Sequence, residues 1–127
     1  MSSIFSKIIT GEIPSYKIYE DEKTLAFLTI RPQTKGHTLV IPKIEVDQWD
    51  DVPEEYFAHM WRTAQFVSKQ LKEKLACERV GVMVAGFEVP HAHIHLIPSN
   101  SIEDFDVTKA YDASEVELKE VYGALVV

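Results

Sequence analysis

The sequence predicts a single α+β domain in which helices pack on an antiparallel sheet. Two segments rich in apolar and aromatic residues, 16–20 and 25–30, flank the short polar stretch 21–23, a pattern typical of a β-hairpin. After Pro53, apolar residues recur at helical spacing. The 127 residues and the hydrophobic content of 46% suit one domain with one core. Strands joined by hairpins, with helices inserted between them, are characteristic of an α+β fold.

The N-terminal third is expected to begin with a short helix. Residues 4–10 carry apolar side chains at helical spacing, and Gly11 is well suited to end a helix because it tolerates a left-handed backbone. After the hairpin, residues 31–36 are polar and contain proline and glycine, which predicts a loop. Residues 37–41 then read as a third strand, ended by Pro42.

The rest of the chain is expected to supply the main helix, two further strands and a last helix. Pro53 opens the main helix, because proline is well accommodated in a first helical turn. Its apolar positions are Phe57, Met60, Trp61, Ala64, Val67, Leu71 and Leu75. Residues 79–85 and 92–97 read as the fourth and fifth strands, and Asp112 with Glu115 predicts a capping box for the last helix.

Charge and composition exclude several classes of partner. The net charge is -7 and no basic stripe is present, so DNA and long RNA are not expected to bind, whereas a small anionic ligand needs only a few local donors. No apolar run approaches the ~20 residues of a membrane span, and the N-terminus lacks the apolar stretch of a secretion signal. Cys77 is the only cysteine, which excludes an intrachain disulfide. The cytoplasm is the expected compartment.

Three histidines near the end of the predicted sheet form the most informative feature. His91, His93 and His95 alternate with apolar residues between Pro90 and Pro98. In a strand, alternate side chains lie on the same face, so the three imidazoles are expected on one face. The apolar residues of the other face belong to the core: Ala92, Ile94 and Leu96.

Imidazole chemistry suits such a cluster for attack on phosphorus. The side chain titrates near neutral pH, and crowding of three rings makes it costly to charge all of them. At least one ring is therefore expected to stay neutral and nucleophilic, able to hold a phosphoryl group covalently. Its neighbours are then placed to fix its tautomer and to bind phosphate oxygens.

Two other interpretations of the histidines remain open at this point. A run of histidines also occurs as solvated or structural residues. Alternatively, neighbours at i and i+2 on a strand are able to share a metal ion, and zinc is the natural candidate for imidazole ligands.

The histidine segment resembles the motif of the histidine triad superfamily, in which three histidines alternate with hydrophobic residues: His91-Ala92-His93-Ile94-His95-Leu96-Ile97. Further stretches, in the right order, resemble the Hint branch of that superfamily: 4–9, 11–14, 19–21, 25–28 and 36–43. Residues 27–30 and 86–91 resemble an actinobacterial-type subgroup. The resemblance covers residues 3–98, so residues 1–127 are interpreted as one such domain, with a core at 3–98 and a C-terminal extension at 99–127.

The resemblance implies a fold and an activity. The fold is a five-stranded antiparallel sheet with two main helices, and two copies commonly form a homodimer with one continuous sheet. Members hydrolyse or transfer nucleoside monophosphates, acting on phosphoramidates or dinucleoside polyphosphates through a nucleotidyl-histidine. The expected ligand is a purine nucleotide or a nucleoside monophosphate conjugate, and no cofactor is expected.

The resemblance also implies a role for individual residues. His93 becomes the nucleophile, His95 contacts the leaving group or the phosphate, and His91 and His37 orient and relay. The nucleotide contacts carried over by position are Phe5, Ile8, Phe27, Leu28, Thr29, Ile30, Leu39, Gly86 and Glu88. Each apolar member of this set, taken alone, also fits a place in the core.

The zinc site of many relatives is not matched here. Those relatives carry Cys-x-x-Cys near the start and a histidine after the Pro-Lys, which bind zinc together with the first histidine of the triad. The matching positions here are Ser3, Ser6 and Glu45. Serine hydroxyls are poor zinc ligands compared with thiolates, so no structural zinc is expected.

Three further departures lie at the expected nucleotide site. Thr29 replaces an aspartate or asparagine that holds the ribose hydroxyls, and threonine makes one such hydrogen bond where a carboxylate makes two. Residues 82–84 lead directly into Ala85 and Gly86, without the Asn-x-Gly of relatives. Glu88 replaces a small hydroxyl residue. Its carboxylate either points to solvent or faces the phosphate, where it would repel a polyphosphate and tolerate an amine leaving group. The last two departures, both beside the triad, keep a second interpretation open, namely a nucleotide-binding regulator with vestigial catalysis.

Overall fold

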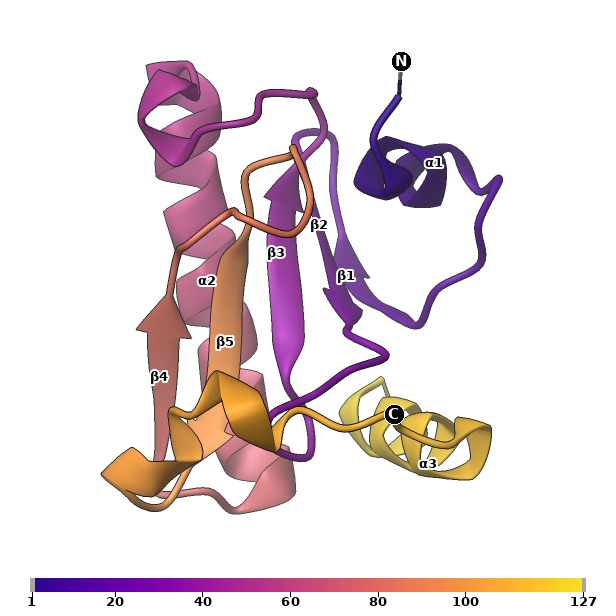
Figure 1. Ribbon diagram of the computed structural model, residues 1–127, viewed down its shortest axis with the longest axis vertical. Helices are drawn as coiled ribbons and strands as arrows, with labels where there is room; N and C mark the ends of the chain where they lie inside the picture. Colours follow the sequence, from indigo (N-terminus) through magenta and orange to yellow (C-terminus); the bar gives the residue numbers. More distant parts are fainter. Residues whose placement is uncertain (1, 127) are drawn as a thin grey trace.

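The computed structural model describes residues 2–126 and contains a five-stranded antiparallel sheet (Figure 1). The strands follow the order β1-β2-β3-β5-β4 across the sheet. Their bounds are Lys17–Glu20 for β1, Thr24–Leu28 for β2, Thr38–Pro42 for β3, Arg79–Met83 for β4 and Ile94–Ser99 for β5. The predicted α+β class and antiparallel sheet are therefore confirmed.

Three α-helices accompany the sheet, one more than the resemblance implied. They are α1 (Ile4–Thr10), α2 (Glu54–Leu75) and α3 (Glu115–Leu125). Three short 3-10 helices, η1 (Trp49–Asp51), η2 (Ile102–Asp104) and η3 (Val107–Lys109), lie in the connections. Helix α1 ends as predicted at Gly11, which has a φ of 86° and donates its N–H to the Ile8 carbonyl oxygen.

Several predicted boundaries are wrong. Strand β3 does end at Pro42, which is its last residue and lies opposite Thr24, but Pro98 does not end β5, since it lies inside that strand, opposite Val80. A proline removes one donor but keeps an extended backbone, so the end of a strand tolerates it. Strand β5 begins only at Ile94, β4 ends at Met83, and β2 ends at Leu28.

The capping box expected at Asp112 is also wrong. The N-cap of α3 is Ser114, whose hydroxyl oxygen accepts the N–H of Glu117. Asp112 instead forms an ion pair of 2.7 Å with Arg31. Helix α3 begins at Glu115, so the residue directly before it, Ser114, is the one placed to cap it.

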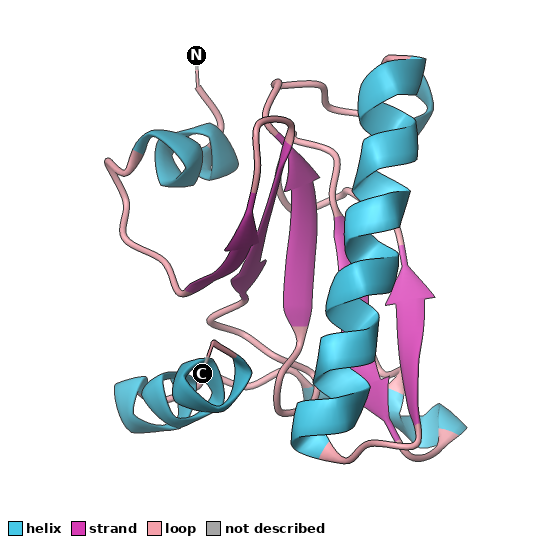
Figure 2. Cartoon of the chain, turned by 180° about the vertical axis from the view of Figure 1, so that it is seen from behind, coloured by secondary structure: helices cyan, strands magenta, loops and turns pink. Residues whose placement is uncertain are grey.

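The two faces of the sheet carry different apolar clusters. Helix α2 lies across one face (Figure 2), where its Val67 and Leu71 belong to the same buried cluster as Val40 and Ile94. Helix α1 covers part of the other face with Phe5 and a smaller buried cluster. Alternation along the strands separates the two clusters, because successive side chains point to opposite faces.

The chain beyond β5 returns to the loop that precedes β3. The Tyr111 N–H donates to the Pro32 carbonyl oxygen and the Ala113 N–H to that of Ile30, each at 3.1 Å. Phe105 packs against Gly81 of β4, where an added methyl group would overlap its ring. Among the described residues, no helix is both long and apolar enough to cross a bilayer.

Candidate active site

Four histidines gather on the face of the sheet that α1 covers. His95 lies in β5, His91 and His93 lie in the extended segment just before it, and His37 immediately precedes β3. The ring centroid of His95 is 4.9 Å from that of His93 and 5.1 Å from that of His37. The Phe5 ring of α1 meets His93 edge-on at 5.1 Å. The structure therefore brings together the four residues predicted to be catalytic.

The hydrogen bond of His93 shows which of its ring nitrogens carries the proton. His93 Nδ1 lies 2.7 Å from the main-chain carbonyl oxygen of His91, and a carbonyl oxygen only accepts. The proton of the neutral ring is therefore on Nδ1, and Nε2 keeps a free lone pair. None of the described residues forms a hydrogen bond with this Nε2, although the side chain is only 4% exposed.

A chain of hydrogen bonds fixes the tautomers of His37 and His95. The main-chain N–H of Gln33 donates to His37 Nδ1 at 3.0 Å, so the His37 proton is on Nε2. That Nε2–H donates to His95 Nδ1 at 2.9 Å. His95 consequently carries its own proton on Nε2, where it is available as a hydrogen-bond donor.

His91 is held by both of its ring nitrogens. Nε2–H donates to the Pro42 carbonyl oxygen at 2.9 Å, so Nδ1 accepts from the Ser3 hydroxyl, also at 2.9 Å. Glu45 accepts from the Ser3 main-chain N–H and from the Ser6 hydroxyl, each at 2.6 Å. These two hydrogen bonds lower the pKa of Glu45. Fully buried, His91 thus links α1 to the end of β3.

Burial keeps the histidines neutral. Desolvation, followed by the neighbouring His95 and His93, lowers the pKa of His37 to about 3. Desolvation and His93 lower the pKa of His95 to about 4. The pKa of His91 and that of His93 are also lowered, mainly by burial. Loss of hydration therefore contributes more than the crowding of like charges on which the sequence argument relied.

The predicted nucleotide-contacting residues fall into separate groups. Four of them share the buried cluster under α1: Phe5, Ile8, Phe27 and Leu39. Leu28 does not join them, because it follows Phe27 in β2 and faces the α2 cluster instead. Ile30, beyond the end of the strand, is 69% exposed. The Thr29 hydroxyl accepts the N–H of Arg31 at 3.2 Å.

The loop before the triad borders a cavity of about 440 Å³. Gly86, with a φ of 83°, turns the chain there and lines this cavity together with His93. Glu88 is exposed, and its charge opposes the fall in the pKa of His93. The opposite wall comes from residues 47–50, which the sequence did not single out. No periodicity or motif marks these loop residues, so only their spatial position reveals them.

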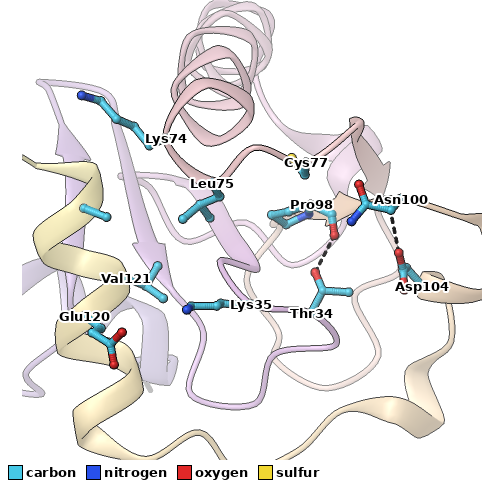
Figure 3. A pocket seen from close by; sticks show the side chains of 11 residues that line it. Thr34, Lys35, Lys74, Leu75, Cys77, Pro98, Asn100, Asp104, Glu120 and Val121 are labelled. Atoms are coloured by element: carbon cyan, nitrogen blue, oxygen red, sulfur yellow. Dashed lines mark hydrogen bonds between the residues drawn. The ribbon is translucent and has the colours of Figure 1, made fainter.

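A second cavity, of about 470 Å³, lies at the other end of the sheet between the C-terminal end of α2 and α3 (Figure 3). Its charged lining is mixed, with Lys35 and Lys74 as well as Asp104 and Glu120. It contains none of the four histidines. It is therefore separate from the candidate active site.

The residues at the position of the zinc site in relatives do not suit zinc. Both ring nitrogens of His91 are engaged, one by Ser3 and one by Pro42, and no thiolate is present. Of the nearby groups, only Glu45 offers an anionic ligand, and its Oε1 already accepts two hydrogen bonds. Across residues 2–126, no three His, Cys, Asp or Glu side chains are arranged to hold a metal ion.

Comparison with known sequences relates the chain to one family. The HIT domain matches residues 10–102. An uncharacterised HIT-like protein of Methanocaldococcus jannaschii is 40% identical, over 94% of this chain and 98% of that protein. An adenosine 5′-monophosphoramidase of Saccharomyces cerevisiae is 38% identical, over 75% of this chain and 61% of its own.

Solved structures agree with the sequence comparison. A HIT-like protein of Bartonella henselae superposes with a TM-score of 0.87 at 32% identity, over 98% of this chain and 94% of its own. A zinc-bound histidine triad protein of Mycobacterium smegmatis superposes with a TM-score of 0.81, also at 32% identity and over the same shares of the two chains. Fold, histidine arrangement and sequence all lead to one conclusion: the chain belongs to the histidine triad family.

Proposed function

We propose that the protein is a nucleotide hydrolase or nucleotidyltransferase that cleaves at the α-phosphate of a nucleoside monophosphate conjugate. The observation that carries this proposal is the state of His93, whose Nδ1–H is held by the His91 carbonyl while Nε2 is unpaired among the described residues. A buried, neutral imidazole with a free lone pair is a nucleophile ready to attack phosphorus.

The reaction then has two steps. In the first, the Nε2 lone pair attacks the α-phosphorus, the bond from phosphorus to the leaving group breaks, and its electron pair departs with the leaving group. The new nucleotidyl-imidazolium is positively charged, and its Nδ1–H remains bonded to the His91 carbonyl oxygen, which stabilises that charge. In the second step, water attacks phosphorus, loses a proton to solvent and returns the electron pair to Nε2.

His95 binds the phosphate in this scheme without giving up its proton. Its Nδ1 accepts from His37, so loss of the Nε2 proton would leave an unstable imidazolate. Its Nε2–H therefore stabilises the negative charge that develops on the phosphate oxygens. An amine leaving group takes up a proton from solvent before or as its bond to phosphorus breaks, so it departs as a neutral amine.

The favoured leaving group is an amine. The Glu88 carboxylate acts electrostatically on His93, and it would repel a polyphosphate. A phosphoramidate, in which an amine is bonded to the phosphorus of a nucleoside monophosphate, avoids this repulsion. The yeast adenosine 5′-monophosphoramidase, 38% identical to this chain, supports the same substrate class.

The test is mass spectrometry of the native protein and the His93→Asn variant after incubation with an adenosine phosphoramidate. We expect release of AMP, or an adenylyl adduct on His93, with the native protein only. Equal AMP release by the variant would refute the role of His93. Tight nucleotide binding without turnover would instead support a regulator with vestigial catalysis, the second candidate, which the short segment before the triad favours.

We also propose that two copies associate through the β4 edge of the sheet. This edge strand has one side unpaired, and Val82 on it is 47% exposed. Trp61 of α2 lines a small hollow together with Val84, just beyond β4, and is 37% exposed. Light scattering of the native protein and of Val82→Lys tests this proposal, and a native monomer would refute it.

A further inference from the structure

The cavity beside His93 differs in character from the apolar cluster under α1. It lies between two loops, residues 47–50 before α2 and residues 84–90 before the triad. Its charged lining residues are Asp47 and Asp50, and neither lysine nor arginine lines it. Glu88 belongs to the second loop and acts on His93. The local field is therefore strongly negative next to the proposed nucleophile.

Two aromatic side chains add a second property to this cavity. Trp49 and Phe87, one from each loop, are 51% and 96% exposed. Aromatic faces attract organic cations, and the attraction is reinforced by nearby carboxylates. An acidic cavity with exposed aromatic rings thus favours a positively charged organic group.

The nucleotide itself does not suit this place. Its phosphate is anionic, and Asp47 and Asp50 would repel it. The leaving group is the only other part of the substrate that must lie close to His93 during attack. A cavity that borders His93 and rejects anions is therefore suited to the leaving group.

We infer that this cavity is the leaving-group subsite and that it selects amines with a remote positive charge, such as a diamine bonded to phosphorus through one nitrogen and free as an ammonium at the other. This inference rests on the proposed phosphoramidase function and narrows its substrate class. Asp47 and Asp50 would determine the preference for this leaving group by stabilising its remote ammonium. Trp49 and Phe87 contact its alkyl chain and charge.

The experiment uses three adenosine phosphoramidates with the same alkyl chain, made from diaminopentane, aminopentanol and aminopentanoate. The far ends of these alkyl chains carry a positive, a neutral and a negative group. They are too distant to change the basicity of the nitrogen bonded to phosphorus by much. We expect the native protein to show a kcat/KM about tenfold higher or more for the cationic than for the anionic substrate. Salt at about 0.5 M should reduce this ratio by screening.

Matched variants assign the preference to the cavity. In the double variant Asp47→Asn/Asp50→Asn, the ratio of kcat/KM for the cationic substrate to that for the anionic substrate should fall close to one. In Asp51→Asn/Glu54→Gln, which removes two exposed charges that do not line the cavity, most of the ratio should remain. Equal turnover of all three substrates by the native protein would overturn this inference and leave the proposed function intact. Absence of turnover and of a His93 adduct with every substrate would refute the proposed function, and this inference with it.

Discussion

His37 Nε2 lies 2.9 Å from His95 Nδ1, and this contact places the proton of the neutral His95 ring on Nε2. Substitution of His37 should therefore act through His95. In His37→Phe, His95 is free to adopt the other tautomer and to lose its donor toward the phosphate. We expect kcat to fall about 10–100-fold with a smaller change in KM. His59→Phe on α2 is the control, and an unchanged kcat in His37→Phe would contradict the relay.

The tautomers themselves are directly measurable. Nitrogen-15 NMR of the native protein near pH 7 should show neutral rings, with the proton on Nδ1 in His93 and on Nε2 in His37, His91 and His95. The reason is the identity of the partners, since carbonyl oxygens accept and main-chain N–H groups donate. A proton on Nε2 of His93 would remove the nucleophile from the mechanism.

The free energy of unfolding should begin to fall below pH 6.5, before the pH is low enough to protonate the carboxylates. The folded-state pKa of His37 is about 3 and that of His95 about 4, below their usual value of 6.5. Below pH 6.5 the unfolded chain binds protons that the folded chain does not. The free energy of unfolding is therefore unaffected above this pH and decreases below it, by up to about 1.4 kcal/mol per pH unit for each histidine.

Urea unfolding at intervals from pH 7 to pH 5 measures this dependence. His37→Phe should show a shallower slope than the native protein, because it has one fewer titrating group. A native curve that is flat over this range would show that the histidines are not buried as neutral rings.

Ser3 should stabilise the protein beyond its role as a helix cap. Ser3→Ala leaves the buried His91 Nδ1 without a donor and removes the cap of α1. We expect a loss of about 1–3 kcal/mol, measured by urea unfolding. Ser3→Thr keeps the hydroxyl and should recover most of the loss, whereas Ser2→Ala is a neutral control.

A chelator should leave the unfolding curve of the native protein unchanged, since Ser3, Ser6, Glu45 and His91 are joined by hydrogen bonds in place of metal ligands.

Glu88 should set the balance between two kinds of leaving group. Glu88→Ser removes a negative charge that acts on His93. We expect kcat/KM for a diadenosine polyphosphate to rise about three- to tenfold relative to an adenosine phosphoramidate. Glu22→Ser, an exposed change in the β1–β2 turn, controls for net charge. An equal ratio in the native protein and Glu88→Ser would remove Glu88 from the specificity argument.

The sequence predicted the faces of the triad segment because alternation is a local property. His93 and His95 lie on the α1 side, while Ile94 belongs to the α2 cluster, as period two requires. The same rule, applied within β2, would have placed Phe27 and Leu28 on opposite faces. The resemblance implies a nucleotide contact for Leu28, and the structure places its side chain in the α2 cluster, on the opposite face from Phe27.

The protonation pattern and the leaving-group cavity could not be predicted from the sequence. The tautomer of His91 depends on the carbonyl of Pro42, and that of His37 depends on the N–H of Gln33. The cavity walls at 47–50 and 84–90 are separated by the whole of α2 and β4. Such contacts arise only when the sheet has assembled, so no spacing in the sequence marks them.

The segment that returns along the Ile30–Pro32 loop has a practical consequence for protein engineering. The family match ends at residue 102, yet Tyr111 and Ala113 brace the loop that leads to Gln33 and His37. A protein truncated after residue 102 would keep every histidine but lose the two main-chain hydrogen bonds that hold the loop before Gln33 and His37. Chimaeras between relatives should therefore exchange this tail and the loop it braces as one unit.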